Sequence, residues 1–540
     1  MKIGRSHLGK ILVLFLFCLA VAVGCHSQNP QPPAQVNQNG VITIGTTLKT
    51  RTLDPADNYE LAGMMLSYNL GETLYTYELG TTKLIPLLAR EMPKISDNGL
   101  IYTIPVRKRI IFHDGTPFNA EAMVFSLRRF IENGGEPSFL LSDAIEKVEA
   151  IKDDEIQIKL KNPFAAFPAL LAFPGACAVS PKAYEIGEGK FVPDQFVGTG
   201  PYKLVDVKND SLKLAAFEQY WGAKPKNKGI TVQIYLGNPA NLFNAFRTGT
   251  VDIAYQSLQA PQVRKLQTEA NEGKWQTIEA SGTAISFLAL NVKTEPLKEK
   301  AVRKAIASLI DRPLLNERIL QGQGEPLYSM VPKTFDVYKP VFEEVYGDHQ
   351  VEKAKQYLKD AGFSTEKPAI VEIWHSSSSV TASMVAGVLK ALAKRDLEDM
   401  IQFQPNSIAS AAYFKNVSRG LYSSAISNWY PDFLDADNYI QPFLSCSSGS
   451  ANDGCKEGGS QSQGSFFYSD RINTLIEQQR QEQDPIKRKA IFTQIQDILA
   501  QEVPYIPLWQ SKDYAFLQNK IKGMILNPNQ LTPFWTIQPS

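Results

Sequence analysis

Strand-like and helix-like segments alternate along almost the whole of this 540-residue chain, and this alternation limits the folds that it can adopt. Period-two patterns predict strands or hairpins over 42–46, 101–106, 147–160 and 202–217. Apolar spacing and capping residues predict helices after Asn119, over 298–310 and after Asp484. The mixture favours α/β or α+β layers over a helical bundle or a β-sandwich. The length predicts about two to four domains, or one large split architecture.

The N-terminus has the pattern of an export signal. Residues 1–10 are basic, residues 11–23 are thirteen consecutive residues without a polar break, and Gly24 and Cys25 follow directly. This order predicts a secretory signal peptide over residues 1–24. The apolar run is shorter than the roughly 17–25 residues that span a bilayer, so the alternative is a short, uncleaved membrane anchor.

Cys25 is a candidate for lipidation. Residues 22–25 (Ala-Val-Gly-Cys) resemble the bacterial lipobox, in which the cysteine thiol carries lipid. Each buried methylene contributes about 0.8 kcal/mol, so two or more acyl chains hold a protein stably at a membrane. Residues 25–40 are rich in Pro, Gln and Asn and predict a lipid anchor followed by a flexible linker. We therefore expect an exported lipoprotein that faces the periplasm or the cell exterior.

The charge balance argues against a nucleic-acid partner. The net charge is +1, and three of the 56 basic residues (Lys2, Arg5 and Lys10) lie in the first 24 residues, which contain no acidic residue. The remaining chain carries 53 basic against 55 acidic residues, a net charge of −2. Proteins that bind nucleic acid nonspecifically need an excess of positive charge.

Three cysteines remain beyond the signal peptide and Cys25. Cys446 and Cys455 lie nine residues apart in a polar loop, which in an oxidising compartment predicts a disulfide. The alternative is a metal site with two thiol ligands, but no two further Cys or His residues lie nearby. Cys177 has apolar neighbours and is expected to be an inert buried thiol.

Motifs for catalysis are missing from the sequence. His26, His113, His349 and His375 are far apart, and there is no His-Glu-x-x-His zinc helix, no Gly-x-Ser-x-Gly elbow, no phosphate-binding loop and no dinucleotide fingerprint. These absences favour a binding protein without metal or cofactor over an enzyme.

Six motifs occur in order between residues 41 and 525. They are 97–121, 197–202, 246–252, Leu290-Asn291 with 301–306 and 311–312, 429–432 with 435–438, and 501–507. Together they resemble the family 5 extracellular solute-binding proteins, the peptide- and nickel-binding lipoproteins of bacterial ABC importers.

The resemblance implies an α/β fold of the two-lobed periplasmic-binding-protein type (type II, large cluster C form) with an additional small α+β domain. In this fold, solute is expected to bind between the lobes, which are expected to close by a hinge. The implied segments are lobe I (41–82, 196–285 and 510–540), the additional domain (83–195) and lobe II (286–509).

Asp432 is the leading ligand-binding candidate. In peptide-binding relatives, an Asp three residues after a Trp pairs with the α-ammonium of the peptide, and Trp429-Tyr430-Pro431-Asp432 has that spacing. A closed cleft excludes water, so a bound ammonium needs an anionic acceptor. The alternative is an Asp in an ordinary Pro turn. Trp429 and Tyr430 are expected to form an apolar wall, although aromatic residues also serve as core.

Four further residues are weaker candidates. Thr46 and Thr47 end the first strand, Asn291 is either a ligand contact or a turn residue, and His375 either contacts ligand or is a solvated loop histidine. Dipeptide-binding relatives carry an Arg after the strand at Ile373-Trp374 to hold the peptide carboxylate. Here His375 and four serines follow, without a basic residue, which favours longer peptides.

The resemblance implies a monomeric receptor that captures oligopeptides and delivers them to an ABC permease and its ATPase, and that is not an enzyme. Other solutes stay open: a dipeptide, a nickel complex, haem or an oligosaccharide. From a different class, a secreted hydrolase acting on cell-wall material is the competing hypothesis.

Overall fold

The computed structural model describes residues 40–255 and 257–540. The predicted signal peptide, Cys25 and nearly all of the predicted linker lie outside the described residues. In the part of the chain that is described, no helix is both long and apolar enough to cross a bilayer.

Eleven strands of the described chain form one large mixed sheet. The order across it is β10 (Tyr202–Val207), β11 (Ser211–Ala216), β12 (Gly229–Ile234), β1 (Val41–Thr46), β13 (Ile253–Tyr255), β21 (Tyr505–Leu517), β14 (Gln276–Leu290), β18 (Ser424–Trp429), β16 (Ala369–Ser376) and β17 (Ile401–Ile408), with β15 (Gly324–Pro326) paired to β21. The predicted strand at 42–46 and the predicted hairpin over 202–217 are confirmed.

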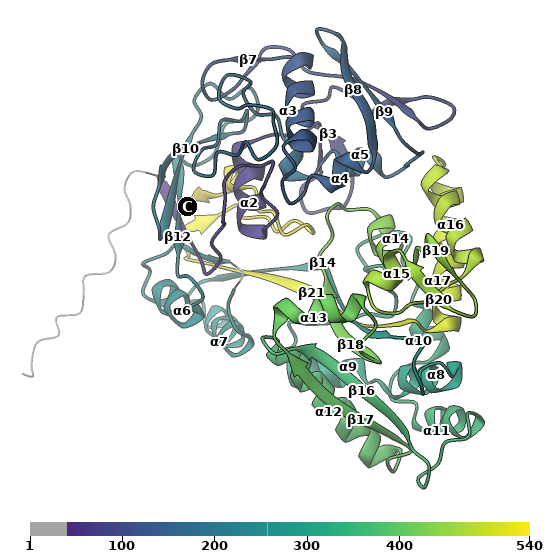
Figure 1. Cartoon of the computed structure of the whole chain (residues 1–540). Helices are drawn as coiled ribbons and strands as arrows, with labels where there is room; N and C mark the ends of the chain where they lie inside the picture. The colour runs from purple at the N-terminus through teal and green to yellow at the C-terminus, as the bar shows by residue number, and fades with distance from the viewer. Residues whose placement is uncertain (1–39, 256) are drawn as a thin grey trace, which may run out of the picture.

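Two long antiparallel strands, β14 and β21, join the halves of this sheet (Figure 1). On one side β12, β1 and β13 run parallel, and on the other side β17, β16 and β18 run parallel. The β14–β21 ladder is interrupted by register shifts between Ser281 and Ile285 and between Ser286 and Phe287. The predicted boundary between lobe I and lobe II at 285/286 falls at these irregularities, where the interrupted ladder offers least resistance to bending.

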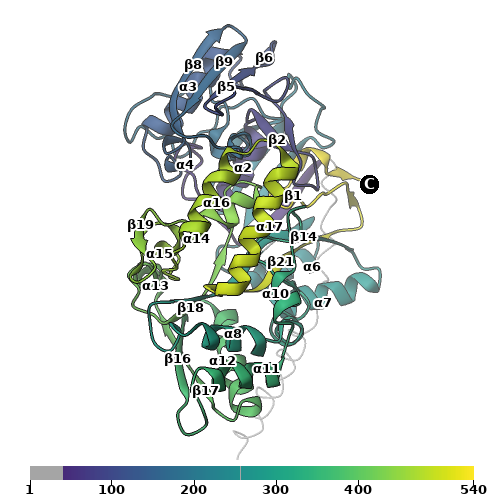
Figure 2. The same cartoon turned by 90° about the vertical axis from the view of Figure 1, so that its right-hand side faces the viewer.

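Helices cover both halves. α2 (Leu61–Leu70), α6 (Pro239–Arg247) and α7 (Ala260–Asn271) belong to the lobe I half. The lobe II half carries α8 (Lys300–Leu309), α11 (Val351–Asp360), α12 (Val380–Asp396), α13 (Ser410–Ser418), α16 (Asp470–Gln481) and α17 (Pro485–Glu502). Figure 2 shows α16 and α17 beside each other along one side of the molecule. Asp484 caps α17 as predicted, since its Oδ1 accepts a hydrogen bond from the Ile486 amide at 2.8 Å.

A second, four-stranded sheet lies within the predicted additional domain, at the top of Figure 1. Its order is β4 (Lys94–Ile95), β5 (Ile101–Pro105), β9 (Glu155–Leu160) and β8 (Ile145–Lys152). Helix α3 (Ala120–Glu132) packs against it and is capped by Asn119, whose Oδ1 accepts from the Ala122 amide at 3.0 Å. The hairpin and the helix predicted from the sequence are both present.

The buried cores suggest different limits for this domain. Leu74 and Tyr75 pack into its core, and β2 (Tyr75–Tyr77) pairs with β3 (Leu84–Pro86). Cys177 and Val179 instead pack into the core of lobe I. Packing therefore favours domain limits near residues 74 and 176 over limits at 83 and 195. A segment belongs to the domain whose strands it pairs with and whose core it shares. The division into domains stays a prediction.

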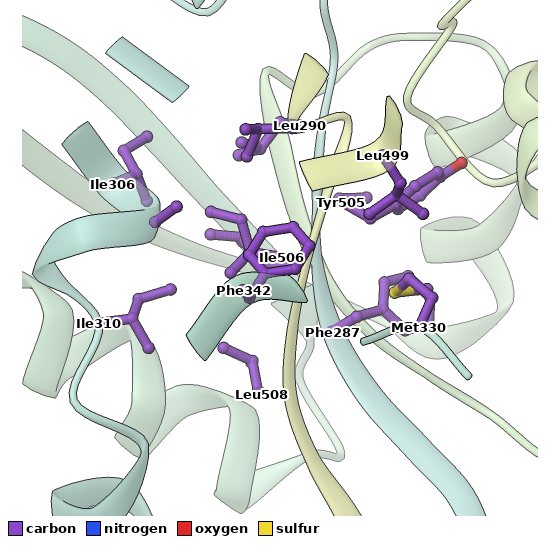
Figure 3. Close-up of a cluster of buried hydrophobic side chains, with 14 of the residues drawn as sticks. Phe287, Leu290, Ile306, Ile310, Met330, Phe342, Leu499, Tyr505, Ile506 and Leu508 are labelled. Atoms are coloured by element: carbon purple, nitrogen blue, oxygen red, sulfur yellow. The ribbon is translucent and has the colours of Figure 1, made fainter. Parts of the chain in front are cut away.

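The core of the lobe II half includes both connecting strands. Phe287 and Leu290 of β14 and Tyr505, Ile506 and Leu508 of β21 are buried together with residues from the surrounding helices (Figure 3). This packing anchors one end of each long strand firmly.

Cys446 and Cys455 form a disulfide in the structure, across the hairpin of β19 (Ser448–Ser450) and β20 (Gly454–Glu457). Cys177 is a free, buried thiol, and burial raises its pKa to about 12. A thiol with so high a pKa remains protonated and unreactive at neutral pH.

Candidate ligand-binding cleft

The carboxyl ends of the parallel strands from both halves border one cleft. β1 and β13 end at Thr46 and Tyr255 on the lobe I side, and β18 ends at Trp429 on the lobe II side. Residues within two positions of the ends of these strands, among them Leu48, Ser257 and Tyr430, line the same cavity. In open α/β sheets, ligands bind outside the carboxyl ends of the strands, so the topology predicts a binding site here.

This central cavity has a volume of about 570 Å³. Its floor is formed by the connecting strands, with Thr283 from β14 and Lys512, Asp513 and Tyr514 from β21. A volume in this range suits a small organic solute or a short peptide.

A second cavity of about 340 Å³ adjoins the first. Phe139 and Phe164 of the additional domain line one side of it, and Trp429 and Asp432 line the other. Tyr59 lines both cavities, so its side chain lies between the two spaces. Three parts of the chain therefore contribute walls to these two neighbouring cavities.

Asp432 is half-buried in the second cavity and has no cationic partner among the described residues. Its Oδ1 accepts a hydrogen bond from the Tyr59 hydroxyl at 2.5 Å, and its backbone N–H donates to Asn438 Oδ1 at 3.0 Å. Burial raises the pKa of Asp432, and hydrogen bonds from Tyr59 and Asn438 oppose that rise. A desolvated carboxylate without a counterion is a favourable position for an incoming cation.

Trp429 and Tyr430 have separate roles. Trp429 Nε1 donates to Asn438 Oδ1 at 3.2 Å, and its ring packs edge-on against Phe443 with centroids 5.3 Å apart. Tyr430 is 57% exposed and lines the central cavity. Asn438 thus fixes both Trp429 and the Asp432 backbone, while Tyr430 is free to contact a solute.

The weaker candidates do not line either cavity. Thr46 Oγ1 accepts from the Leu48 amide at 3.1 Å, and the carbonyl of buried Thr47 accepts from the Gly237 amide. Asn291 Oδ1 accepts from the Lys293 amide in a local turn, and its Nδ2 donates to the carbonyl of Tyr422, 131 positions away in the sequence. The geometry of Asn291 is that of a turn residue, the alternative that its sequence context left open.

The expectation of a solvated loop at His375 is wrong. His375 belongs to β16 and is only 5% exposed, because it shares the inward face of the strand with Val371 and Ile373. Its Nδ1 lies 3.0 Å from the Ser376 carbonyl. The strand β16 is longer than the sequence pattern indicated. The loop begins with the serines that come after the last residue of β16.

Two cleft residues were missed by the sequence analysis. Tyr59 lies in an irregular segment with no motif, so nothing in the sequence marks it. Asp513 is an acidic residue inside a long strand-like run. This pattern could have identified it from the sequence, because an unpaired acidic residue in a central strand is unusual. Its Oδ1 accepts from Gln530 Nε2 at 2.8 Å.

The basic side chains of the cleft are already paired. Lys512 lies 3.2 Å from Glu279, and Arg480 lies 2.8 Å from Asp437. The carboxylates of Asp432 and Asp513 have no such partner among the described residues, so the cleft has an excess of negative charge. In the described part of the chain, no group of three His, Cys, Asp or Glu residues is placed to hold a metal ion.

Comparison with solved structures confirms the two-lobed α/β fold. HbpA2 from Haemophilus parasuis superposes with a TM-score of 0.80 at 20% identity, covering 93% of this chain and 100% of the other. The unliganded, open form of the periplasmic murein tripeptide-binding protein MppA gives a TM-score of 0.78 at 20% identity, covering 93% of this chain and 98% of the other.

Sequence relatives point the same way. Heme-binding protein A of Haemophilus influenzae is 26% identical over 86% of each chain. Glutathione-binding protein GsiB of Escherichia coli is 27% identical over 94% of this chain and 96% of its own, and the dipeptide-binding protein of Escherichia coli is 24% identical over 86% and 87%. The profile of the bacterial extracellular solute-binding proteins, family 5 middle region, matches residues 83–451. Because this match covers more than half of the chain, the protein belongs to family 5 of the bacterial extracellular solute-binding proteins, and it is a binding protein rather than an enzyme.

Proposed function

We propose that the protein is the substrate-binding lipoprotein of an ABC importer and that it captures oligopeptides in the cleft between its lobes. Asp432 is the observation that carries this proposal. It offers a desolvated carboxylate without a cation, three residues after Trp429, in a cavity open to solute. A peptide α-ammonium is a cation of suitable size and charge for this position. Relatives named for dipeptide and glutathione binding support a peptide-like solute.

Peptides longer than two residues are the preferred class. A dipeptide clamp needs a cation close by for the peptide carboxylate, and no basic residue follows β16 at Ser377–Ser379. The two adjoining cavities have room for additional residues, and each buried apolar side chain adds about 1.5–3 kcal/mol.

Calorimetry with a set of peptides of two to five residues tests this proposal. We expect tri- and tetrapeptides to bind at least about tenfold more tightly than dipeptides of the same composition, which corresponds to about 1.4 kcal/mol. Mass spectrometry of solute that co-purifies with the protein provides an independent answer. Recovery of haem, a metal complex or a sugar, with no binding by any peptide, would exclude the proposed cargo. Turnover of labelled cell-wall fragments would favour a hydrolase instead.

Lipid anchoring at Cys25 is a separate proposal with its own test. Cys25→Ser is expected to release the protein from the membrane fraction, since an oxygen in place of the thiol cannot form the thioether to lipid. Cys18→Ser is the matched control, because Cys18 lies within the predicted signal peptide and should leave the protein membrane-bound. Fractionation and immunoblotting measure the outcome. Equal membrane retention of both variants would rule out the anchor.

A further inference from the structure

Asp513 is a buried carboxylate with one oxygen left without a partner. It lies in the middle of β21, is only 7% exposed and lines the central cavity. Its Oδ1 accepts from Gln530, but Oδ2 has no hydrogen-bond partner among the described residues. Buried polar atoms in proteins are nearly always paired, so an unpaired carboxylate oxygen at a cavity requires an explanation.

This oxygen lies close against Gly282. Gly282 lies in the irregular part of β14 between Ser281 and Ile285. A Cβ atom at position 282 would collide with the Ser511 hydroxyl and lie 3.0 Å from Asp513 Oδ2. The Ser511 hydroxyl is also buried without a partner. Two unpaired oxygens therefore lie against the same glycine, and a side chain at position 282 would displace them.

Among residues 40–255 and 257–540, no cationic side chain neutralises Asp513. Lys512, its neighbour on the same strand, pairs with Glu279, and no other basic side chain of these residues lines the central cavity. Burial raises the pKa of Asp513 to about 6, so the carboxyl is largely ionised at neutral pH. An ionised, buried group without a counterion destabilises the solute-free protein, and a bound cation would remove that cost.

We propose that Asp513, together with Ser511, binds a second cationic group of the solute, so that the cleft selects peptides with a basic side chain. The ammonium or guanidinium of that side chain donates to Asp513 Oδ2 and the Ser511 hydroxyl. The peptide amino terminus binds at Asp432 in the adjoining cavity. This inference rests on the proposed function, because it assigns a side-chain subsite to the same cleft.

Paired peptides test the inference on the purified full chain. One set of tri- and tetrapeptides carries a single lysine at each position in turn, and the other carries norleucine, which has nearly the same shape without the charge. In wild type we expect the best lysine peptide to bind at least about tenfold more tightly than its norleucine counterpart. Asp513→Asn should reduce that ratio to about one and leave the affinity for the norleucine peptide within about twofold. Gly282→Ala should reduce the ratio too, because the added methyl would displace the Ser511 hydroxyl and Asp513 Oδ2 while keeping the charge.

The outcomes separate this inference from the proposed function. An unchanged lysine-to-norleucine ratio in Asp513→Asn would overturn the subsite while leaving peptide binding intact. If no peptide binds wild type, the proposed function fails, and cadaverine and spermidine then decide the subsite. Binding of these amines that is lost in Asp513→Asn would support it, and no amine binding would overturn it. Asp153→Asn, in the exposed turn between β8 and β9, controls for the change in net charge.

Discussion

Arg129→Met is expected to lower the free energy of unfolding by about 3–5 kcal/mol, because it leaves the buried carboxylate of Asp54 without its counterion. The two side chains are 1% and 0% exposed. Arg129 Nη1 and Nη2 donate to the two oxygens of Asp54 at 2.8 and 2.6 Å, and Nε donates to the Glu185 carbonyl at 3.1 Å. Urea denaturation followed by circular dichroism measures the change.

Arg128→Met is the matched control. Arg128 is the preceding residue of α3, is half exposed and pairs with Glu132 one helical turn away. Its loss should cost only about 0.3–0.5 kcal/mol. Adding Asp54→Asn to Arg129→Met should recover part of the stability, since a neutral amide requires no buried counterion. Equal losses from the two arginine variants would contradict the assigned role of Arg129.

The Arg129–Asp54 pair also affects the cleft. Asp54 accepts hydrogen bonds from the Ala56 and Val192 amides at 3.0 and 2.7 Å, and so fixes the segment that leads to Tyr59. Tyr59 then reaches Asp432 across the cleft. A buried ion pair between the additional domain and the lobe I segment that holds Asp54 thereby helps to position a residue that lines both cavities.

Local patterns predicted the elements well. The strand at 42–46, the hairpins over 147–160 and 202–217, and the helices after Asn119 and Asp484 form where alternation and capping indicated them. These features depend on residues that are close together in the sequence, so they can be recognised from one sequence alone.

Features that depend on distant contacts were beyond such patterns. The Tyr59–Asp432 hydrogen bond joins residues 373 positions apart, and the pairing of β14 with β21 brings residues near 280 beside residues near 513. His375 was misplaced for the same reason, because the parallel pairing of β16 with β17 extends the strand as far as Ser376. Asp432 was found through its spacing from Trp429, whereas Asp513 required the three-dimensional arrangement of the two connecting strands.

Asp432→Asn is expected to weaken the binding of a peptide with a free amino terminus by about 2–5 kcal/mol, roughly 30- to 5,000-fold in Kd. The asparagine side chain has nearly the same shape, and it can still accept the Tyr59 hydrogen bond, but it lacks the charge that an ammonium needs. Calorimetry with one peptide in free and N-acetylated forms measures the effect. The acetylated form, which carries no ammonium, should bind both proteins equally.

Tyr59→Phe separates ligand binding from support of the cleft wall. If Asp432 acts only as the acceptor for the Tyr59 hydroxyl, Tyr59→Phe should weaken the free and the acetylated peptide alike, and Asp432→Asn, which keeps an acceptor, should weaken neither. If Asp432 binds the ammonium, Tyr59→Phe removes a competing donor and should retain the preference for the free peptide. Tyr59 and Asp432 come from opposite walls of the cleft, and a 2.5 Å hydrogen bond joins them. Tighter binding by Tyr59→Phe would show that this hydrogen bond competes with the solute, and weaker binding would show that it forms together with the bound solute.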